Sequence, residues 1–395
     1  MIVKPKIRGF ICTTAHPAGC AESVRLQAEH AKAHYLETAP KRVLVIGSSG
    51  GYGLASRIMA CFGGGADTVG IHFDKAPSET RTGTSGFYTT RAFDQLAQKE
   101  GRLSYSINGD AFSQEIKNKA AEAIAQLPGG QVDLVIYSLA APKRTDAAGR
   151  TYSSVIKPIG APFEGKTVDF NTGEVSCARV APATDSEIEE TVAVMGGSDW
   201  KDWIALLREK NLLAPGACTV AFSYIGPERT HAIYKSGTIG RAKLDLEQAA
   251  SELNRTLQEE IGGCAYISVN KALVTQASAA IPVVPLYISL LYKVMKQRGL
   301  HEGCIEQAER LFGRLYGTES AGNPLGAPTD SSRRIRLDDL EMKKEVQEDV
   351  NELWDKVTSE NIGELADIAG YREAFLQIFG FAIPGIDYDA DTEIL

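Results

Sequence analysis

The sequence predicts an α/β fold with a doubly wound sheet of parallel strands. Short apolar runs alternate with amphipathic stretches over most of the 395 residues. The runs are mostly continuous in apolarity, which is typical of parallel strands buried on both faces. A glycine-rich turn follows the first long run and precedes a helical stretch, and this order commonly opens a doubly wound sheet.

Six apolar runs are the predicted strands. In chain order they are Arg42 to Gly47, Thr68 to Phe73, Leu103 to Ile107, Val132 to Ser138, Cys218 to Tyr224 and Ala265 to Val269. The amphipathic stretches between them are the predicted helices, at Tyr52 to Phe62, Arg91 to Glu100, Ser113 to Leu127 and Ala242 to Ile261. Strands that alternate with helices of this length favour parallel pairing.

Three segments fall outside this alternation. Residues 1–20 contain two prolines and short β-like pieces, and we expect a hairpin laid over the sheet. Residues 142–184 are rich in Gly, Pro, Thr and Ala and are too long for an ordinary connection, so they should carry local structure or cover a site. From about His301 the chain is helical, with a strand-like piece at 334–337 and a helix of mixed charge at 340–357.

We expect residues 1–395 to form a single elaborated unit, because α/β enzymes of this size often fold as one. Residues 1–80 would form the hairpin and the dinucleotide-binding part. Residues 81–318 would form the catalytic part, with the loop insert 142–184, and residues 319–395 a C-terminal helical extension.

Composition and charge exclude several classes of protein. Apolar residues make up 44% of the chain and charged residues 23%, as in an ordinary globular protein. The net charge of -8 and the pI near 5.5 argue against nucleic-acid binding, which normally shows as a basic face. No segment reaches the apolar length of a membrane span. Small molecules are therefore the expected partners.

The seven cysteines indicate a reducing compartment. They are odd in number, widely spread and without a Cys-x-x-Cys or zinc spacing. The amino terminus carries charge but no apolar stretch of signal-peptide length. We therefore expect a cytoplasmic protein.

The glycine-rich turn predicts a nucleotide site. Residues Gly47, Ser48, Ser49, Gly50, Gly51, Tyr52 and Gly53 follow the apolar run Val43 to Ile46 and precede a helix. Bare backbone amides and a helix N-terminus at this place can bind a pyrophosphate. A tight strand-to-helix turn without chemical function is the alternative.

Polar residues at the ends of later strands extend this prediction. Asp74 ends the second strand, 21 residues beyond Gly53, where a carboxylate accepts hydrogen bonds from the adenosine ribose and repels a 2′-phosphate. This favours NAD over NADP, although the neighbouring Lys75 partly offsets the repulsion. Asp110 and Ala111 after the third strand, and Ser138 to Ala140 after the fourth, are the expected adenine and nicotinamide neighbours.

Tyr234 and Lys243 form a candidate catalytic pair. On a continuous helix nine residues turn through about 900°, which would place the two side chains on opposite faces. Gly237 and Gly240 permit a turn after Tyr234 and a helix that begins near Ile239. Lys243 would then face the tyrosine and lower its pKa from about 10, as a proton donor at neutral pH requires. A purely structural pair is the alternative.

Two further features bear on the site. Tyr224, at the end of the fifth strand, would present a second hydroxyl over one substrate oxygen. The run from Leu273 to Tyr292 is small, apolar and interrupted by proline, so it lines an acyl slot or forms a core helix with an irregular start. His30 and His34 are four residues apart, but no third ligand is evident from the sequence, so we expect no metal.

These residues and several longer motifs resemble one known family. The motifs are Ile-Arg-Gly-Phe-Ile-Cys-Thr-Thr-Ala-His-Pro, the extended glycine-rich turn, Tyr-Ser-Leu-Ala-Ala-Pro-Lys-Arg-Thr-Asp, Tyr-Ile-Gly-Pro-Glu, Tyr-x8-Lys and His-Glu-Gly-Cys-Ile-Glu-Gln. The chain is similar, from residue 1 to about 387, to the monomeric trans-2-enoyl-CoA and enoyl-acyl-carrier-protein reductases. The resemblance implies a Rossmann-type fold larger than a short-chain dehydrogenase, and NADH-dependent reduction of the C2=C3 bond of trans-2-enoyl thioesters in fatty-acid metabolism.

The resemblance also implies residue roles. Tyr234 would be the proton donor, Tyr224 would contact the substrate carbonyl and Lys243 the cofactor. The cofactor positions fall on Gly47, Ser48, Ser49, Gly50, Gly51, Tyr52, Phe73, Asp74, Asp110, Ala111, Ser138, Leu139, Ala140, Leu273, Val274 and Thr275. The family more often has glutamate where this chain has Asp74. The substrate would be an enoyl-CoA or an enoyl-acyl-carrier protein.

Two other functions are compatible with the residues. A carbonyl reductase or alcohol dehydrogenase of the short-chain type would use the same tyrosine and lysine on a ketone. A non-catalytic dinucleotide-binding protein would keep the turn without the chemistry, although the presence of Tyr224, Tyr234 and Lys243 together weighs against it.

Overall fold

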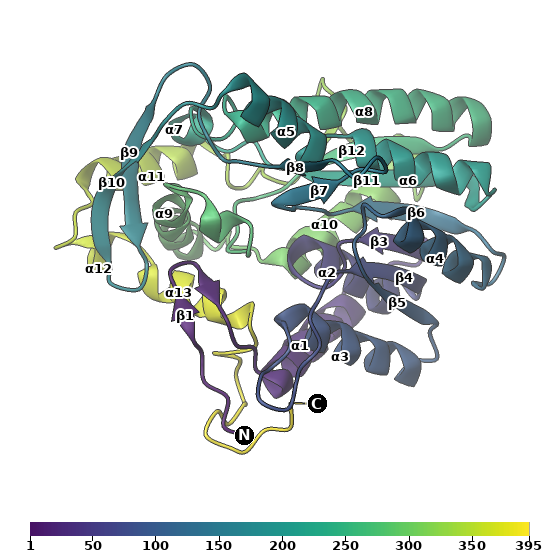
Figure 1. Ribbon diagram of the computed structural model, residues 1–395, viewed down its shortest axis with the longest axis horizontal. Helices are drawn as coiled ribbons and strands as arrows, with labels where there is room; N and C mark the ends of the chain where they lie inside the picture. The colour runs from purple at the N-terminus through teal and green to yellow at the C-terminus, as the bar shows by residue number, and fades with distance from the viewer. Residues whose placement is uncertain (395) are drawn as a thin grey trace.

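The computed structural model describes residues 1–394 and is organised around one parallel sheet of seven strands (Figure 1). The strand order is β13 (Arg334–Arg336), β12 (Cys264–Val269), β11 (Leu213–Ser223), β6 (Val132–Tyr137), β3 (Arg42–Ile46), β4 (Asp67–His72) and β5 (Ser104–Asn108). The chain builds outward from β3 to β5, then crosses back to β6 and builds outward again to β13. This order confirms the predicted doubly wound fold.

Helices cover both faces of the sheet. One face carries α1 (Pro17–Ala33), α2 (Gly51–Ile58) with the π-helical turn η1 (Met59–Gly63), α3 (Ser85–Lys99) and α10 (Cys304–Tyr316). The other carries α4 (Gln114–Ala125), α6 (Ser198–Glu209) and α8 (Thr238–Ile261). Within β3, Val43 and Val45 pack on the first face and Leu44 and Ile46 on the second, and all four are fully buried. Burial of each such side chain contributes about 1.5–3 kcal/mol.

The insert between β6 and β11 carries local structure, as the sequence predicts. It contains two antiparallel hairpins, β7 (Lys143–Thr145) with β8 (Thr151–Ser153) and β9 (Phe163–Asp169) with β10 (Glu174–Val180). The helix α5 (Asp185–Met195) follows and packs against α8. Its N-terminus is closed by a capping box in which Thr184 and Glu187 satisfy each other's backbone amides.

A second hydrophobic core, called the second core body below, lies beside the carboxyl edge of the sheet (Figure 1). Its members are α9 (Val284–Gln297), α11 (Lys344–Lys356), α12 (Ile362–Leu365), α13 (Ile368–Gln377) and the β9–β10 hairpin. Four short helical elements lie in connections between the larger elements: α7 (Glu228–His231), η2 (Ser278–Ala280), η3 (Thr318–Ser320) and η4 (Pro324–Gly326). The apolar run after β12 therefore contains a core helix with an irregular start, since α9 begins only at Val284.

The N-terminal hairpin is present but does not lie over the seven-stranded sheet. It consists of β1 (Ile7–Arg8) and β2 (Ile11–Cys12). Val3 and Cys12 are buried in the second core body, and Asn171 at the β9–β10 turn donates to the carbonyl of Gly9 at 3.4 Å. The expected placement was wrong because helices already cover both faces of the sheet. No helix among residues 1–394 is long and apolar enough to cross a membrane.

Candidate active site

The glycine-rich turn joins β3 to α2 in a conformation that requires glycine. Gly47 has φ of +86°, and a Cβ there would lie 2.2 Å from the carbonyl oxygen of Ser138. Gly51 has φ of +52°, and a Cβ on Gly53 would lie 1.9 Å from the carbonyl oxygen of Gly47. The turn is therefore packed tightly against the end of β6.

The same turn leaves a cradle for a phosphate group. Around Gly50 no atom lies within 4 Å of an added Cβ, and α2 begins at the next residue. Backbone amides at a helix N-terminus stabilise anions, and a bare backbone lets a pyrophosphate approach them. Ser48 is buried and donates to the carbonyl of Ile71 on β4, which fixes the turn on the sheet. These residues fit the diphosphate of NADH.

The end of β4 presents an exposed ring beside a restrained carboxylate. Phe73 is 80% exposed, as suits a ring that would lie against an adenine. The Asp74 carboxylate accepts from the Thr84 hydroxyl at 2.7 Å and lies 2.9 Å from Nδ1 of His72. Burial favours a higher pKa for Asp74, but hydrogen bonds from His72, Thr84 and Ser49 outweigh it and lower that pKa. Asp74 is therefore anionic at neutral pH, beside the turn.

Residues from two other strand ends border the turn. Ser138 and Leu139, after β6, lie within 3.4 Å of a Cβ built on Gly47. Thr275, after β12, lies 3.7 Å from a Cβ built on Gly51. Ala140 follows Ser138 and Leu139 in the chain. Leu273 and Val274 are buried just before Thr275. The amide of Val274 donates to the Tyr292 hydroxyl at 3.2 Å. The doubly wound topology thus gathers the predicted residues at one edge of the sheet.

Asp110 and Ala111 follow β5. Ala111 is buried, and the Asp110 carboxylate accepts from the Phe112 amide at 2.9 Å, which fixes the turn into α4. Both residues lie on the same carboxyl edge, at the adenine end of the predicted site. Their contact with a cofactor stays a prediction.

The turn predicted between Tyr234 and Lys243 is present. The helix α8 begins at Thr238, one residue before the predicted start. A Cβ on Gly240 would lie 1.8 Å from the carbonyl oxygen of Lys235, so only glycine fits where the chain folds back. Because of this turn, Tyr234 and Lys243 do not lie on opposite faces of one continuous helix.

Lys243 is directed to the sheet rather than to the tyrosine. Its Nζ donates to the carbonyl oxygen of Phe222 at 2.9 Å, and the Phe222 ring packs against the ring of Tyr52 from α2. Phe222 belongs to β11, so the Lys243 ammonium group is held at the carboxyl end of that strand. Burial lowers the pKa of Lys243 to about 8.

The expected lowering of the Tyr234 pKa is not found. Burial raises the pKa of Tyr234 above 10, with no contribution from Lys243. The Tyr234 side chain is 8% exposed, and its hydroxyl makes no hydrogen bond with any described residue. The prediction failed because it assumed contact between the two side chains. A neutral phenol remains suited to donate a hydrogen bond to a developing oxyanion.

Tyr224 lies against Tyr234 and brings the second hydroxyl. The two rings make an edge-to-face pair with centroids 5.2 Å apart and an interplanar angle of 68°. Tyr224 follows the last residue of β11, and its hydroxyl donates to Oε1 of Glu341 at 3.1 Å. Burial and the neighbouring Glu341 raise the pKa of Tyr224 well above 10. Sequence reasoning missed Glu341, which lies 117 residues further along the chain.

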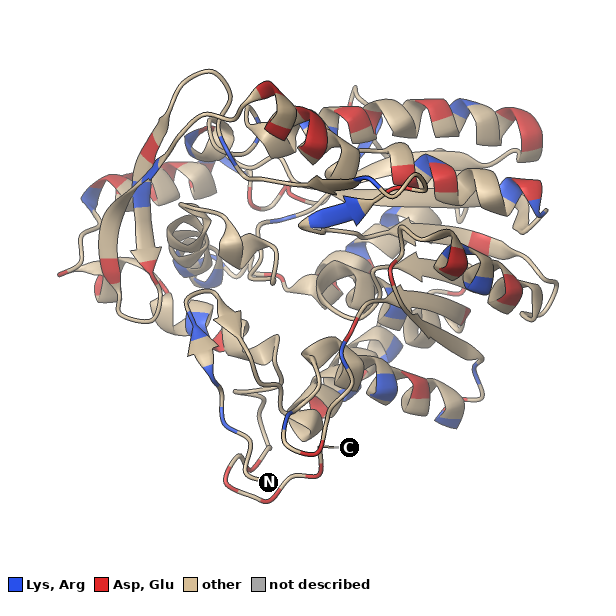
Figure 2. Cartoon of the chain, in the orientation of Figure 1, with Lys and Arg blue, Asp and Glu red and all other residues tan. Residues whose placement is uncertain are grey.

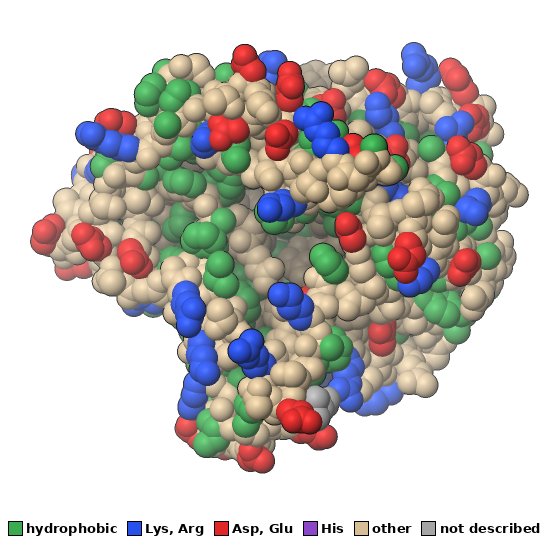
Figure 3. All heavy atoms as spheres, viewed as in Figure 1, with side chains coloured by type: hydrophobic (Ala, Val, Ile, Leu, Met, Phe, Trp, Pro, Cys, Tyr) green, Lys and Arg blue, Asp and Glu red, His purple; other side chains and the backbone are tan. Residues whose placement is uncertain are grey.

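A hollow opens on the face of the molecule where these elements meet. Figure 3 shows it at the centre of the view, with hydrophobic side chains on one side and Lys and Arg side chains around its rim. Part of this basic rim lies on β7, which carries Lys143 and Arg144 (Figure 2). An apolar wall with a basic rim suits an acyl chain that is attached to an anionic carrier.

His30 and His34 have a third neighbour that the sequence did not reveal. Nε2 of His30 lies 2.8 Å from Glu309 on α10, and Nδ1 of His34 lies 3.7 Å from it. The three ligand atoms are close enough together for one ion. The two rings are stacked, and Nδ1 of His34 is within hydrogen-bonding distance of the carbonyl of His30. In this structure the group links α1 to α10.

Comparisons with known sequences match three regions of the chain. Residues 2–79 match the NAD(P)H binding domain of trans-2-enoyl-CoA reductase, and residues 81–316 match the trans-2-enoyl-CoA reductase catalytic region. Residues 329–392 match a region described as an enoyl reductase FAD binding domain. Enoyl-acyl-carrier-protein reductases (NADH) of Flavobacterium johnsoniae and Coxiella burnetii are each 55% identical; the first alignment covers 99% of this chain and 98% of the relative, the second 100% and 96%.

Solved structures agree with these sequence matches. The trans-2-enoyl-CoA reductase of Clostridium acetobutulicum in complex with NADH has a TM-score of 0.95 at 43% identity, covering 100% of this chain and 98% of that one. The enzyme of Treponema denticola in complex with NAD has a TM-score of 0.93 at 50% identity, covering 99% and 98%. Fold and site together define an NADH-dependent oxidoreductase. Within that class, the chain belongs to the trans-2-enoyl-CoA reductase family.

The C-terminal match raises the question of a flavin. Residues 329–392 contribute one edge strand, β13, and the helices α11 to α13. Their large side chains, among them Trp354, Tyr371 and Phe375, are buried in the second core body. Within the described part of this segment there is no strand-turn-helix unit with a glycine cradle like that of Gly47. These residues do not fit a flavin site of their own, and instead they supply Glu341 to Tyr224.

Proposed function

We propose that this chain reduces the C2=C3 bond of trans-2-enoyl thioesters with NADH, using Tyr234 and Tyr224 to stabilise the substrate oxygen. The observation that carries the proposal is the edge-to-face pair of Tyr224 and Tyr234, with Tyr224 at the same carboxyl edge of the sheet as the nucleotide turn. The Tyr234 hydroxyl has no hydrogen-bond partner among residues 1–394, so it can meet a substrate. When bound, NADH supplies a hydride to the enoyl chain.

The tyrosine side chains then stabilise the developing negative charge and supply a proton. Negative charge gathers on the thioester oxygen as the double bond is reduced, and hydrogen-bond donors fixed in advance stabilise it without reorganisation. The Tyr234 hydroxyl donates a hydrogen bond to this oxygen. The Tyr224 hydroxyl, at the end of β11, donates a second hydrogen bond to the same oxygen. Transfer of the Tyr234 proton to the enolate gives the saturated acyl thioester once that proton reaches C2, and Tyr234 regains a proton from water before the next turnover. The buried walls around the two rings exclude water from the reacting atoms.

Lys243 is proposed to hold the cofactor through its ammonium group. Because burial lowers its pKa to about 8, the charge is present at pH 7 and is lost as pH rises through 8. We therefore expect the dissociation constant for NADH to rise above pH 8. Fluorescence titration between pH 6.5 and 9.5 measures this. Lys243→Met should bind NADH about 10-fold more weakly at pH 7, the equivalent of about 1.4 kcal/mol, and show a flatter profile.

Asp74 is proposed to set the preference for NADH. Its anionic carboxylate repels a 2′-phosphate, so Asp74→Asn should raise kcat/KM for NADPH relative to NADH by about 10-fold. The side-chain amide keeps a hydrogen bond to Thr84 and removes only the charge. Parallel steady-state assays with both cofactors measure the ratio. An unchanged ratio would remove Asp74 from the specificity argument.

We further propose a monomeric cytoplasmic enzyme that takes its acyl chain from coenzyme A or acyl-carrier protein. All seven cysteines are free thiols, which supports a reducing compartment. The basic rim of the hollow suits the phosphates of either carrier. Steady-state kinetics with matched enoyl chains on both carriers test the proposal, and the preferred carrier is the one with the higher kcat/KM. Absence of turnover with both carriers would overturn it.

A further inference from the structure

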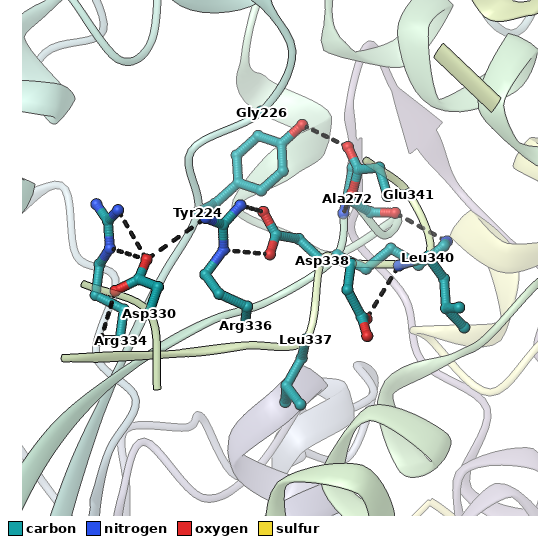
Figure 4. Close-up of polar contacts among 12 residues, drawn as sticks. Tyr224, Gly226, Ala272, Asp330, Arg334, Arg336, Leu337, Asp338, Leu340 and Glu341 are labelled. Atoms are coloured by element: carbon teal, nitrogen blue, oxygen red, sulfur yellow. Dashed lines mark hydrogen bonds and ion pairs between the residues drawn. The ribbon is translucent and has the colours of Figure 1, made fainter. Parts of the chain in front are cut away.

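Glu341 is a buried carboxyl group that makes contact with the active-site tyrosines. It is fully inaccessible to solvent. Its Oε1 accepts from the Tyr224 hydroxyl at 3.1 Å and from the Tyr287 hydroxyl at 2.7 Å, and its Oε2 accepts from the Ala272 amide at 2.6 Å. Figure 4 shows the Tyr224 ring directed at this carboxyl.

The backbone holds Glu341 in place independently of Tyr224. The amide of Leu337 donates to the carbonyl of Val269 at 2.8 Å, which continues the pairing of β13 with β12. Arg336 and Asp338, on either side of Leu337, form an ion pair of 2.7 Å (Figure 4). The carboxyl is thus fixed to the end of β12, where Ala272 also lies.

The direction of one proton follows from counting donors and acceptors. A tyrosine hydroxyl has a single proton to donate. The Tyr287 oxygen already accepts from the Gln347 side chain at 3.1 Å while its proton goes to Glu341. If Glu341 is ionised, Tyr224 gives its proton to Oε1 and has none for a substrate. If Glu341 is protonated, it donates to the Tyr224 oxygen, and the Tyr224 proton is free to point at the thioester.

We infer that Glu341 is the positioning residue of Tyr224, and that its own proton decides whether Tyr224 donates to the substrate oxygen. The inference rests on the proposed function of the tyrosine pair. In the protonated state the three groups form a chain from Glu341 through Tyr224 to the thioester oxygen, and such chains polarise one another. The C-terminal segment thereby takes part in catalysis without touching the substrate.

The surroundings of Glu341 favour the protonated form. Burial raises its pKa, and Asp338 on its own segment adds to this effect. The Ala272 amide, the Tyr287 hydroxyl and the cation of Lys271 act in the opposite direction. Among the described residues, Tyr52 on α2 and Tyr224 just after β11 also face it. As pH rises, Glu341 ionises and Tyr224 loses its free proton, so activity should fall.

The first test is a double-mutant cycle of Glu341→Leu and Tyr224→Phe. Tyr224→Phe should lower kcat by about 100-fold, the usual effect of losing one oxyanion donor. Glu341→Leu should lower kcat by less, because it keeps the Tyr224 hydroxyl and removes only the group that orients and polarises it. Together they should lower kcat no further than Tyr224→Phe alone, because Glu341 acts only through that hydroxyl. Independent, multiplicative losses would overturn the inference, as would a fully active Glu341→Leu enzyme.

The second test uses Glu341→Gln and remains informative if the leucine variant does not fold. With its oxygen on the Ala272 amide, the glutamine nitrogen donates permanently to Tyr224, as protonated Glu341 does, while the Tyr287 hydroxyl loses Oε1 as its acceptor. At saturating NADH, kcat of the wild type should fall at lower pH than that of Glu341→Gln. Superimposable pH profiles would contradict the inference, and so would a glutamine variant as inactive as the leucine variant.

The controls separate this inference from the proposed function. Glu348→Gln changes an exposed glutamate seven residues along on α11, and it should leave both kcat and its pH profile unchanged. NADH affinity, measured for every variant, should match the wild type, because Glu341 is fully buried and is not one of the predicted cofactor-binding residues. An inactive wild type on every enoyl thioester would refute the proposed function itself, whereas an active wild type with unaffected Glu341 variants would refute only this inference.

Discussion

Tyr234→Phe should lower kcat for an enoyl thioester by about 100- to 1000-fold. The substitution removes a hydroxyl that has no hydrogen-bond partner in the described part of the chain, and it keeps the ring that packs on Tyr224. No buried group loses a partner, so the free energy of unfolding should change by less than about 0.5 kcal/mol. Single-turnover and steady-state assays with saturating NADH measure the loss.

NADH binding and a matched tyrosine variant are the two controls for the Tyr234→Phe prediction. The dissociation constant for NADH should be unchanged, because the hydroxyl acts on the substrate oxygen. Tyr35→Phe removes the hydroxyl of a 56% exposed tyrosine and should keep full activity. Full activity in Tyr234→Phe would remove this residue from the role of proton donor.

Gly53→Ala should destroy the nucleotide site. Its Cβ would lie 1.9 Å from the carbonyl oxygen of Gly47 and 3.1 Å from the Ser138 hydroxyl, so α2 has to move away from β3 and β6. Overpacking of this kind costs about 1–3 kcal/mol of unfolding free energy. The displaced helix also carries the pyrophosphate cradle, and NADH affinity should fall by more than about 10-fold.

Gly50→Ala tests whether the effect of Gly53→Ala comes from close packing at residue 53 or from the loss of any glycine in the turn. Gly50 has an extended backbone with φ of -159° and no atom within 4 Å of an added Cβ. The unfolding free energy of the Gly50→Ala variant should stay within about 0.5 kcal/mol of that of the wild type. Chemical denaturation of both variants provides the comparison, and equal stability of Gly53→Ala and the wild type would refute the close packing described for this turn.

The features predicted correctly from the sequence are those with local causes. The run from Val43 to Ile46 is apolar because β3 is buried on both faces, and Gly47 and Gly51 follow it because their positive φ angles favour glycine. The turn before α8 was predictable for the same reason, since Gly240 leaves no room for a side chain.

The features that were missed depend on contacts between distant segments. Glu341 reaches Tyr224 because β13 pairs with β12, and nothing near Tyr224 in the sequence indicates this. The N-terminal hairpin was placed wrongly because its position depends on a core body formed by later helices. The coupling of Lys243 to Tyr234 was wrong because spacing alone does not show that Lys243 donates to Phe222.

Reduction of a double bond rather than a carbonyl is the central claim. Its most direct measurement is NADH consumption with a trans-2-enoyl thioester and with the 3-keto thioester of the same chain length and carrier, with mass spectrometry of both products. The account predicts rapid oxidation of NADH and a saturated acyl thioester from the enoyl substrate, with little turnover of the ketone. Preferential reduction of the 3-keto thioester to a hydroxyacyl product would contradict it.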